Sequence, residues 1–158
     1  MGAGKTTIGT RVAKRLGLPF IDSDRELERR TGHTARQILA EQGEDALHAQ
    51  EADVVMQALD APERAVVAAP ASIVDTPALR DRIRREDAVW LKADPQVLVE
   101  RTAKSHNAAR PFVDRDPSVL VRQYEERKDF YRDVASLVVD TSTQDKDEAA
   151  DEIVDWLT

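Results

Sequence analysis

The order of apolar segments along the chain constrains its fold more than any other sequence feature. Short runs rich in Val, Ile, Leu and Phe alternate with longer stretches that carry a helical pattern. Parallel strands need a crossover segment, which is usually a helix, so this alternation predicts an α/β fold with helices on both faces of a parallel sheet. The strands are expected at 18–22, 64–69, 88–93 and 136–141.

Helices are predicted from the 3.6-residue period of apolar residues and from capping signals. Ile8 and Leu16, for example, share one face of a segment that ends at Gly17. Proline follows Asp or Thr at the start of three later segments, which is typical of a helix N-terminus. Residues 105–116 show no period and are expected to form a loop. The helices are expected at 5–17, 24–32, 35–43, 44–60, 75–86, 94–104, 116–135 and 147–157.

Size and composition narrow the class of protein. With 158 residues, the chain is expected to form a single domain over 1–158. Its formal net charge of −7 argues against sequence-independent nucleic-acid binding, because phosphates repel an acidic surface. There are no cysteines, and no apolar run approaches the roughly 18 residues of a membrane span. We therefore expect a cytoplasmic monomer that acts on a small molecule and binds neither nucleic acid nor membrane.

The N-terminal stretch MGAGKTTIG has the pattern of a phosphate-binding loop. Gly4, Lys5 and Thr6 match the last three fixed positions of G-x-x-x-x-G-K-[ST]. Glycine lets backbone N–H groups turn toward phosphate oxygens, and the helix that follows adds its positive N-terminal end. In this pattern Lys5 reaches the β- and γ-phosphates of a nucleotide and the Thr6 hydroxyl binds Mg²⁺. The alternative is a glycine-rich helix start without a ligand.

Several motifs together resemble the shikimate kinase family: GAGKTTIG, FIDSD, LVERT, ARPF and ERKDFYRDVASLVVDT, with RTGHTARQILAEQGEDAL between the first two predicted strands. The resemblance implies a three-layer P-loop kinase fold with a parallel sheet of order 2-3-1-4-5. It also implies transfer of the γ-phosphoryl group of ATP to a hydroxyl of shikimate, with Mg²⁺, in aromatic amino-acid biosynthesis. The acceptor-binding segment would be about 24–60 and a lid about 103–116.

The resemblance also assigns roles to individual residues. Asp24 would be a catalytic residue that grips the acceptor's hydroxyls, together with Lys5 and with Arg110 of the lid, which meets the transferring phosphate. Acceptor contacts would come from Asp24, His48, Ala71 and Arg127, of which Arg127 pairs with the acceptor's carboxylate. Mg²⁺ would be bound by Thr6 and, through water, by Asp22. ATP would be held by Gly2, Ala3, Gly4, Lys5, Thr6, Thr7, Arg110 and Arg101, the last lying against adenine.

Three of these residues have a plainer interpretation. Asp22 can serve as the N-cap of the helix that follows it. Arg127 can be a solvated helix residue paired with Glu126 or Asp129. Arg110 can be an ordinary loop arginine. The residues alone leave both interpretations open at each position.

The chain departs from the family pattern at its N-terminus. The family has a central strand before the phosphate loop, and here that first strand is absent, as is the first glycine of the loop motif. We expect the remaining strands to form two half-sheets separated by a gap. We also expect the natural chain to begin upstream of Met1.

Two further departures affect the acceptor side. The family's three glycines after the third strand are replaced by Pro70, Ala71 and Ser72, which removes one N–H group and narrows the approach. The family's F-R pair reads Leu47 and His48, and His cannot make the planar two-pronged contact of Arg with a carboxylate. Plainer interpretations remain: a strand-to-helix turn at Pro70 and an exposed helix histidine at His48.

The pattern of retained and altered residues supports phosphate handling more strongly than shikimate specificity. The leading prediction is therefore a shikimate kinase-like enzyme. The alternatives are a kinase for another small polyol or cyclitol, and a non-catalytic nucleotide-binding relative.

Overall fold

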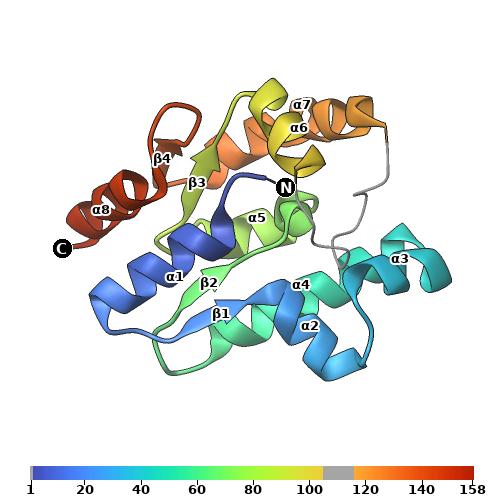
Figure 1. The fold of residues 1–158 in the computed structure, drawn as a ribbon. Helices are drawn as coiled ribbons and strands as arrows, with labels where there is room; N and C mark the ends of the chain where they lie inside the picture. The colour runs from blue at the N-terminus through green and yellow to red at the C-terminus, as the bar shows by residue number, and fades with distance from the viewer. Residues whose placement is uncertain (1, 105–115) are drawn as a thin grey trace.

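The computed structural model describes residues 2–104 and 116–158. The four strands expected from the sequence are all present, each shorter than its predicted segment. The strands are β1 Phe20–Asp22, β2 Val66–Ala68, β3 Val89–Lys92 and β4 Leu137–Asp140. The helices are α1 Lys5–Leu16, α2 Ser23–Thr31, α3 Ala35–Gln42, α4 Glu44–Asp60, the 3₁₀ helix η1 Ala71–Val74, α5 Pro77–Ile83, α6 Pro95–Ala103, α7 Pro117–Val134 and α8 Lys146–Leu157 (Figure 1).

The strands form two parallel pairs. β1 pairs with β2 so that Ile21 faces Val67, and β3 pairs with β4 so that Leu91 faces Val139. Helices separate the partners of each pair along the chain, as parallel pairing requires. The prediction of a parallel α/β fold is confirmed.

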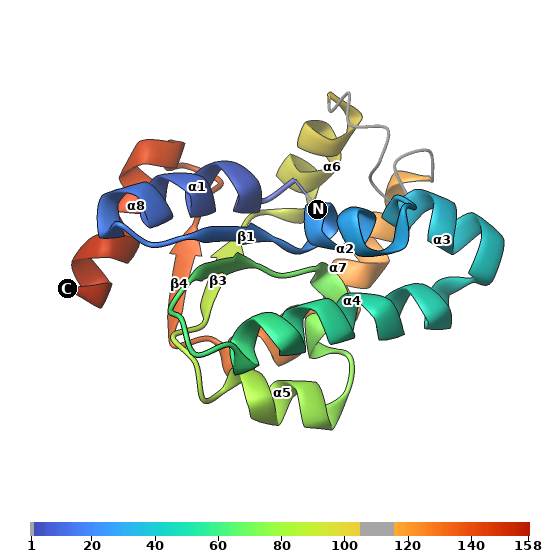
Figure 2. The ribbon, with the colours of Figure 1, turned by 90° about the horizontal axis from the view of Figure 1, so that it is seen from below.

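Helices cover both faces of the strands in a three-layer arrangement. Figure 2 shows α1 and α8 on one face and α4 and α5 on the other. On the first face, Ile8 and Val12 of α1 pack with Val139 and with Ile153 of α8. On the second face, Val55 of α4 packs with residues of η1 and α7. Each layer thus buries its own apolar cluster, as the amphipathic helix patterns predict.

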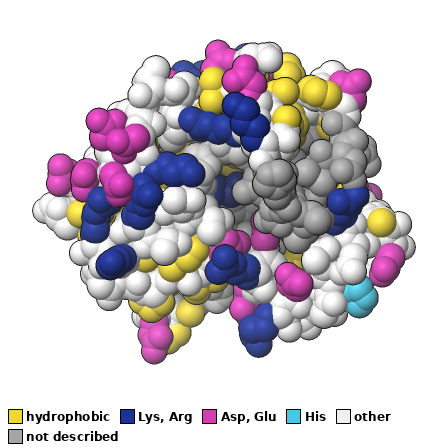
Figure 3. All heavy atoms as spheres, viewed as in Figure 1, with side chains coloured by type: hydrophobic (Ala, Val, Ile, Leu, Met, Phe, Trp, Pro, Cys, Tyr) yellow, Lys and Arg dark blue, Asp and Glu magenta, His cyan; other side chains and the backbone are white. Residues whose placement is uncertain are grey.

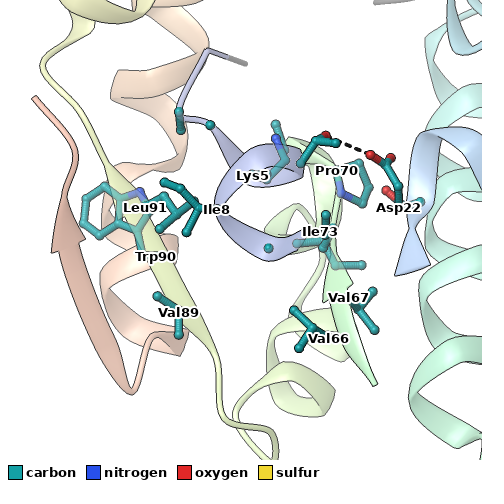
Figure 4. Close-up of a pocket in the computed structure, with 18 of the residues that line it drawn as sticks. Lys5, Ile8, Asp22, Val66, Val67, Pro70, Ile73, Val89, Trp90 and Leu91 are labelled. Carbon is teal, nitrogen blue, oxygen red and sulfur yellow. Dashed lines mark hydrogen bonds between the residues drawn. The ribbon is translucent and has the colours of Figure 1, made fainter. Parts of the chain in front are cut away.

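The space between β2 and β3 is bridged by a helix. Within residues 2–104 and 116–158, no strand pairs with the facing edges of β2 and β3. Figure 4 shows α1 across this space in projection, with Val66 and Val67 on one side and Val89 and Leu91 on the other. The helix itself lies on the first face of the strands, over the space. A cleft of about 1670 Å³ runs from this space to the N-terminal end of α1. The cleft therefore lies between the two strand pairs.

A third apolar cluster holds α2, α3 and α4 together. Leu27, Ile38 and Leu47 are fully buried in it, one from each helix. Thr34 caps α3 with a reciprocal bond to Gln37, which fixes the start of that helix. This packing places the N-terminal part of α4 beside the cleft.

Two local details differ from the sequence prediction. The helix expected over 75–86 ends at Ile83, and the next residues continue as turns in which the Glu86 N–H donates to the Ile83 carbonyl. After Pro70, the expected turn becomes the 3₁₀ helix η1. Its tight form fits between a proline and the Thr76 cap of α5.

Two neighbouring valines of β4 test the packing on the first face. Val139 is 0% exposed and Val138 is 42% exposed, because successive strand residues point to opposite faces. Val139→Ala is expected to lower the free energy of unfolding by about 2 kcal/mol, from lost burial and the cavity left behind. Val138→Ala, the matched control, should cost less than about 1 kcal/mol. Urea denaturation of both variants measures the difference, and equal losses would contradict this account of the core.

Candidate active site

The loop before α1 has the geometry of an anion-binding turn. Gly2 and Gly4 both have left-handed φ angles, +76° and +91°, and α1 starts directly after them. A Cβ atom on Gly2 would lie 3.1 Å from the Leu98 carbonyl oxygen and 3.2 Å from Oγ1 of Thr102. Only glycine fits this approach of the loop to α6 without strain. The loop thus presents backbone N–H groups at the positive end of a helix.

Thr6 and Asp22 meet at the mouth of the cleft. The Thr6 hydroxyl donates to Oδ2 of Asp22 at 2.8 Å, and Figure 4 shows Asp22 turned toward α1 at this point. Oδ1 of Asp22 accepts from the Asp24 N–H at 3.1 Å, so Asp22 is also the N-cap of α2. Both interpretations of Asp22 are therefore compatible in one structure. Mg²⁺ prefers oxygen ligands such as hydroxyl and carboxylate groups, so the Thr6–Asp22 pair fits this ion.

No larger metal-binding cluster accompanies this pair. In the part of the chain that the structure describes, no group of three or more His, Cys, Asp and Glu side chains could hold a metal ion. A magnesium ion at Thr6 and Asp22 would thus take its other ligands from elsewhere, in keeping with its habit of binding through few protein groups and substrate phosphates.

Arg101 ties α6 to the phosphate loop. Its guanidinium donates to the Gly2 carbonyl at 3.3 Å and to the Thr141 carbonyl at 2.5 Å. It also donates to the Thr141 hydroxyl at 3.2 Å. The structure thus places Arg101 at the phosphate loop, next to the segment that follows β4.

The residues expected to contact the acceptor come together along the same cleft. Asp24, His48, Ala71 and Arg127 all line it, as do Lys5 and Thr6. They belong to α2, α4, η1 and α7, which the packing of the second face and of the α2–α4 cluster brings together. Arg110 lies outside the described residues, as does most of the expected lid.

Arg127 is not the solvated helix residue that the sequence left open. Its side chain is 12% exposed and pairs with Asp75, not with Glu126 or Asp129. Nε and Nη2 of Arg127 donate to the two carboxylate oxygens of Asp75 at 2.8 and 2.9 Å. Burial lowers the pKa of Arg127, but the hydrogen bond to Asp75 and nearby negative charges raise it overall.

Asp75 is a residue of this site that the sequence motifs do not indicate. The pair joins residues 52 positions apart, and Asp75 stands beside Thr76, where it looks like part of a helix start. Only the packing of α7 on η1 brings the two side chains together. The bond from the Tyr131 hydroxyl to the Ala71 carbonyl at 2.7 Å fixes the same contact. No local signal in the sequence indicates this pair.

His48 faces the cleft and is half-buried. Its side chain is 23% exposed, with Nδ1 at 3.6 Å from Oδ2 of Asp75 and Nε2 at 3.8 Å from Oε1 of Glu44. The exposed-histidine interpretation therefore does not describe this position. Both ring nitrogens have a carboxylate as neighbour.

Glu51 is a buried acid at the centre of the site. It is 5% exposed and accepts a 2.6 Å hydrogen bond from the Ser72 hydroxyl. Burial raises the pKa of Glu51 from its ordinary 4.5 to about 7, against the lowering effect of Ser72. Asp24 raises this pKa further, and Arg127 and Lys5 lower it, so these charges act on one another across the cleft. Ser72, which replaces a family glycine, thus supplies Glu51 with its partner.

The face of the molecule shown in Figure 3 is hollowed at its centre. Lys and Arg side chains lie on its upper and left rim and within it, and acidic side chains lie below it. The view is that of Figure 1, so the hollow lies near the N-terminal end of α1. A basic rim with acids beside it suits a phosphorylated ligand next to a hydroxylated one.

The profile of the family described as shikimate kinase matches residues 1–158. The chain belongs to the shikimate kinase family. It is 36% identical to the shikimate kinase of Pseudoalteromonas atlantica, over 98% of this chain and 91% of that protein. It is 34% identical to the bifunctional shikimate kinase/3-dehydroquinate synthase of Thermotoga maritima, over 90% of this chain but only 28% of the length of that protein.

A solved structure of the family has the same fold. Shikimate kinase from Acinetobacter baumannii, in complex with shikimate, superposes with a TM-score of 0.89 at 28% identity. The match covers 99% of this chain and 88% of that one. The P-loop kinase fold and the resemblance drawn from the sequence motifs are both confirmed.

The buried acid of this family member predicts a pH dependence of stability. Because the pKa of Glu51 is higher in the folded than in the unfolded chain, only the folded state keeps the proton between pH 4.5 and about 7. The free energy of unfolding should therefore fall as pH rises through this window, by up to about 3 kcal/mol. Glu51→Gln keeps an acceptor for Ser72 but cannot ionise, so it should remove this slope.

Denaturation of both proteins from pH 4.5 to 8 measures the difference. Glu126→Gln is the control, since the Glu126 side chain is 65% exposed on α7. If the free energy of unfolding changed with pH in the same way for the natural protein and for Glu51→Gln, ionisation of Glu51 would not destabilise the folded state.

Proposed function

We propose that the chain transfers the γ-phosphoryl group of ATP to a hydroxyl of shikimate. One observation carries the proposal: a single cleft holds the glycine turn with Lys5 at one end and Asp24 with Arg127 at the other. Phosphoryl transfer needs mainly positioning and neutralisation of charge, and this arrangement offers both. The names of the relatives agree with it.

On the ATP side, the backbone N–H groups of Gly2, Ala3 and Gly4 would bind phosphate oxygens. Lys5 would neutralise the charge that develops between the β- and γ-phosphates. Thr7 would add a hydroxyl at the first turn of α1. Arg101, already joined to the Gly2 carbonyl, would lie against the nucleotide base.

Thr6 and Asp22 would hold Mg²⁺. Their hydrogen bond places a hydroxyl and a carboxylate oxygen together, so Thr6 would bind the ion directly and Asp22 would bind it through water. When bound, Mg²⁺ supplies further neutralisation of the phosphate charge. Asp22 would keep its bond to the Asp24 N–H, and this bond would hold the ion site and the acceptor site at a fixed distance from each other.

On the acceptor side, Asp24 would orient a ring hydroxyl and accept its proton. The hydroxyl oxygen then bonds to the γ-phosphorus while the bond from that phosphorus to the bridging oxygen breaks, and ADP leaves. Arg127, His48 and the Ala71 turn would border the rest of the ring. Arg110, expected to reach the transferring group, stays a prediction because it lies outside the described residues.

The setting of the enzyme also stays a proposal. We expect a cytoplasmic monomer that contacts neither nucleic acid nor membrane. None of the helices within 2–104 and 116–158 has the length and apolar character needed to cross a bilayer.

Lys5 provides the direct test of phosphoryl transfer. Lys5→Met should lower kcat at least about 100-fold, since it removes a charge aimed at the transferring phosphate. Lys14→Met, at the other end of α1, is the matched control and should retain activity. A coupled assay of ADP release in the presence of shikimate gives kcat for both variants. A Lys5→Met enzyme within threefold of the natural one would overturn the assignment.

Thr6 tests the ion site. Thr6→Val keeps the shape of the side chain but removes the hydroxyl, so affinity for MgATP should fall about tenfold while affinity for ATP in excess EDTA stays nearly unchanged. Thr10→Val is the control, because the Thr10 hydroxyl lies one turn further along α1 and donates to the Thr6 carbonyl. Calorimetric titrations of the natural protein and both variants, with MgATP and with ATP in EDTA, supply the six affinities. Equal losses with and without Mg²⁺ would mean that Thr6 serves the fold and not the ion.

A further inference from the structure

A carboxylate of the chain itself already occupies Arg127. The two-pronged contact with Asp75 uses both carboxylate oxygens, at 2.8 and 2.9 Å. A guanidinium binds the carboxylate of a ligand with this same parallel geometry. The Nε and Nη2 edge of Arg127 is therefore engaged before any ligand arrives, and the charge of the guanidinium is already paired.

Arg127 lines the cleft and its side chain is 12% exposed. Asp75 does not belong to the lining and is 29% exposed, so its carboxylate reaches Arg127 from beside the cleft. Arg127 lowers the pKa of Glu51 and Glu51 raises the pKa of Arg127. The pKa of Glu51 is also raised by Asp24 and lowered by Lys5. Arg127 is thus the buried cation of the acceptor end, and Lys5 is the cation of the phosphate end.

The second basic group of the acceptor end also faces acids. His48 has the Asp75 carboxylate at 3.6 Å on one side and the Glu44 carboxylate at 3.8 Å on the other. Asp75 therefore lies between His48 and Arg127, where a negatively charged group of a ligand would gain most. A ligand carboxylate at this position would be repelled by Asp75 or would have to displace it.

Building on the proposed function, we propose that Asp75 is a specificity-determining residue that takes the place of an acceptor carboxylate. A ring polyol with an uncharged group at this position meets a neutralised Arg127 and suffers no repulsion. Shikimate, which carries a carboxylate, gains less from Arg127 while Asp75 neutralises the charge of the guanidinium. The acceptor class of this chain is thus hydroxylated six-membered rings, with no preference for a negative charge.

The experiment compares shikimate with its uncharged methyl ester, which has the same ring and hydroxyls. The natural protein should show KM values for the two acceptors within about threefold. Asp75→Asn keeps the size and one acceptor oxygen but removes the charge. It should lower the KM for shikimate about tenfold and leave the KM for the ester and both kcat values nearly unchanged.

Two further variants isolate the effect. Asp81→Asn on α5 makes the same change in net charge, but Asp81 is 68% exposed and pairs with Arg84 outside the cleft. It should alter neither KM. His48→Arg should have little effect alone, because Asp75 would neutralise the new cation. Combined with Asp75→Asn it should lower the KM for shikimate further, so the two changes are not additive.

Each outcome decides one point. A natural enzyme that prefers shikimate over the ester tenfold or more overturns the inference without any mutation. So does an Asp75→Asn enzyme with unchanged or higher KM for shikimate, while phosphorylation of shikimate still upholds the proposed function. Calorimetric binding of shikimate and the ester to each variant gives the same comparison without turnover. Binding of neither acceptor, with ATP still bound, overturns both proposals.

Discussion

The packing of α1 against one face of both strand pairs is the contact on which the position of the phosphate loop depends. Ile8 and Val12 bury their side chains against β4 and α8, with partly buried residues of β2 and β3 around them. Among the described residues no strand pairing joins the two pairs, and this apolar cluster contains residues of both. The N-terminal end of α1 is thereby set at the mouth of the cleft, with Lys5 and Thr6 in its first turn.

The two ends of the cleft are linked through side chains with more than one role. Asp22 accepts from Thr6 and from the Asp24 N–H, so the phosphate end and the start of α2 are joined by one carboxylate. Glu51 then links the acceptor end to the phosphate end and to the start of α2, because its pKa depends on Arg127, Lys5 and Asp24. A bound phosphate would add negative charge near this set and favour the protonated form of Glu51. A change of charge at the phosphate end is therefore expected to change the protonation of Glu51 at the acceptor end.

The sequence predicted the strands, the helices and the phosphate loop because these depend on local patterns. The runs at 64–69 and 88–93 are apolar over a strand's length, and Thr34 with Gln37 forms a capping box within four residues. It also led to Arg127, although only through the resemblance. It could not lead to Asp75, since no sequence pattern relates residues 52 positions apart. The sequence also could not predict the form of the turn after Pro70 or the burial of Glu51.

The sequence by itself determined the class of fold and the pattern of the phosphate loop, because periodicity, caps and the glycine turn act over a few residues. The tertiary structure alone decided the acceptor side. There, η1, α4 and α7 meet through apolar packing, and that packing selects which charges become neighbours. Interaction between charges depends on their distance and burial in space and not on their separation along the chain. For this reason Arg127 could be recognised as a cation from the sequence, while its partner Asp75 could be found only in the folded molecule.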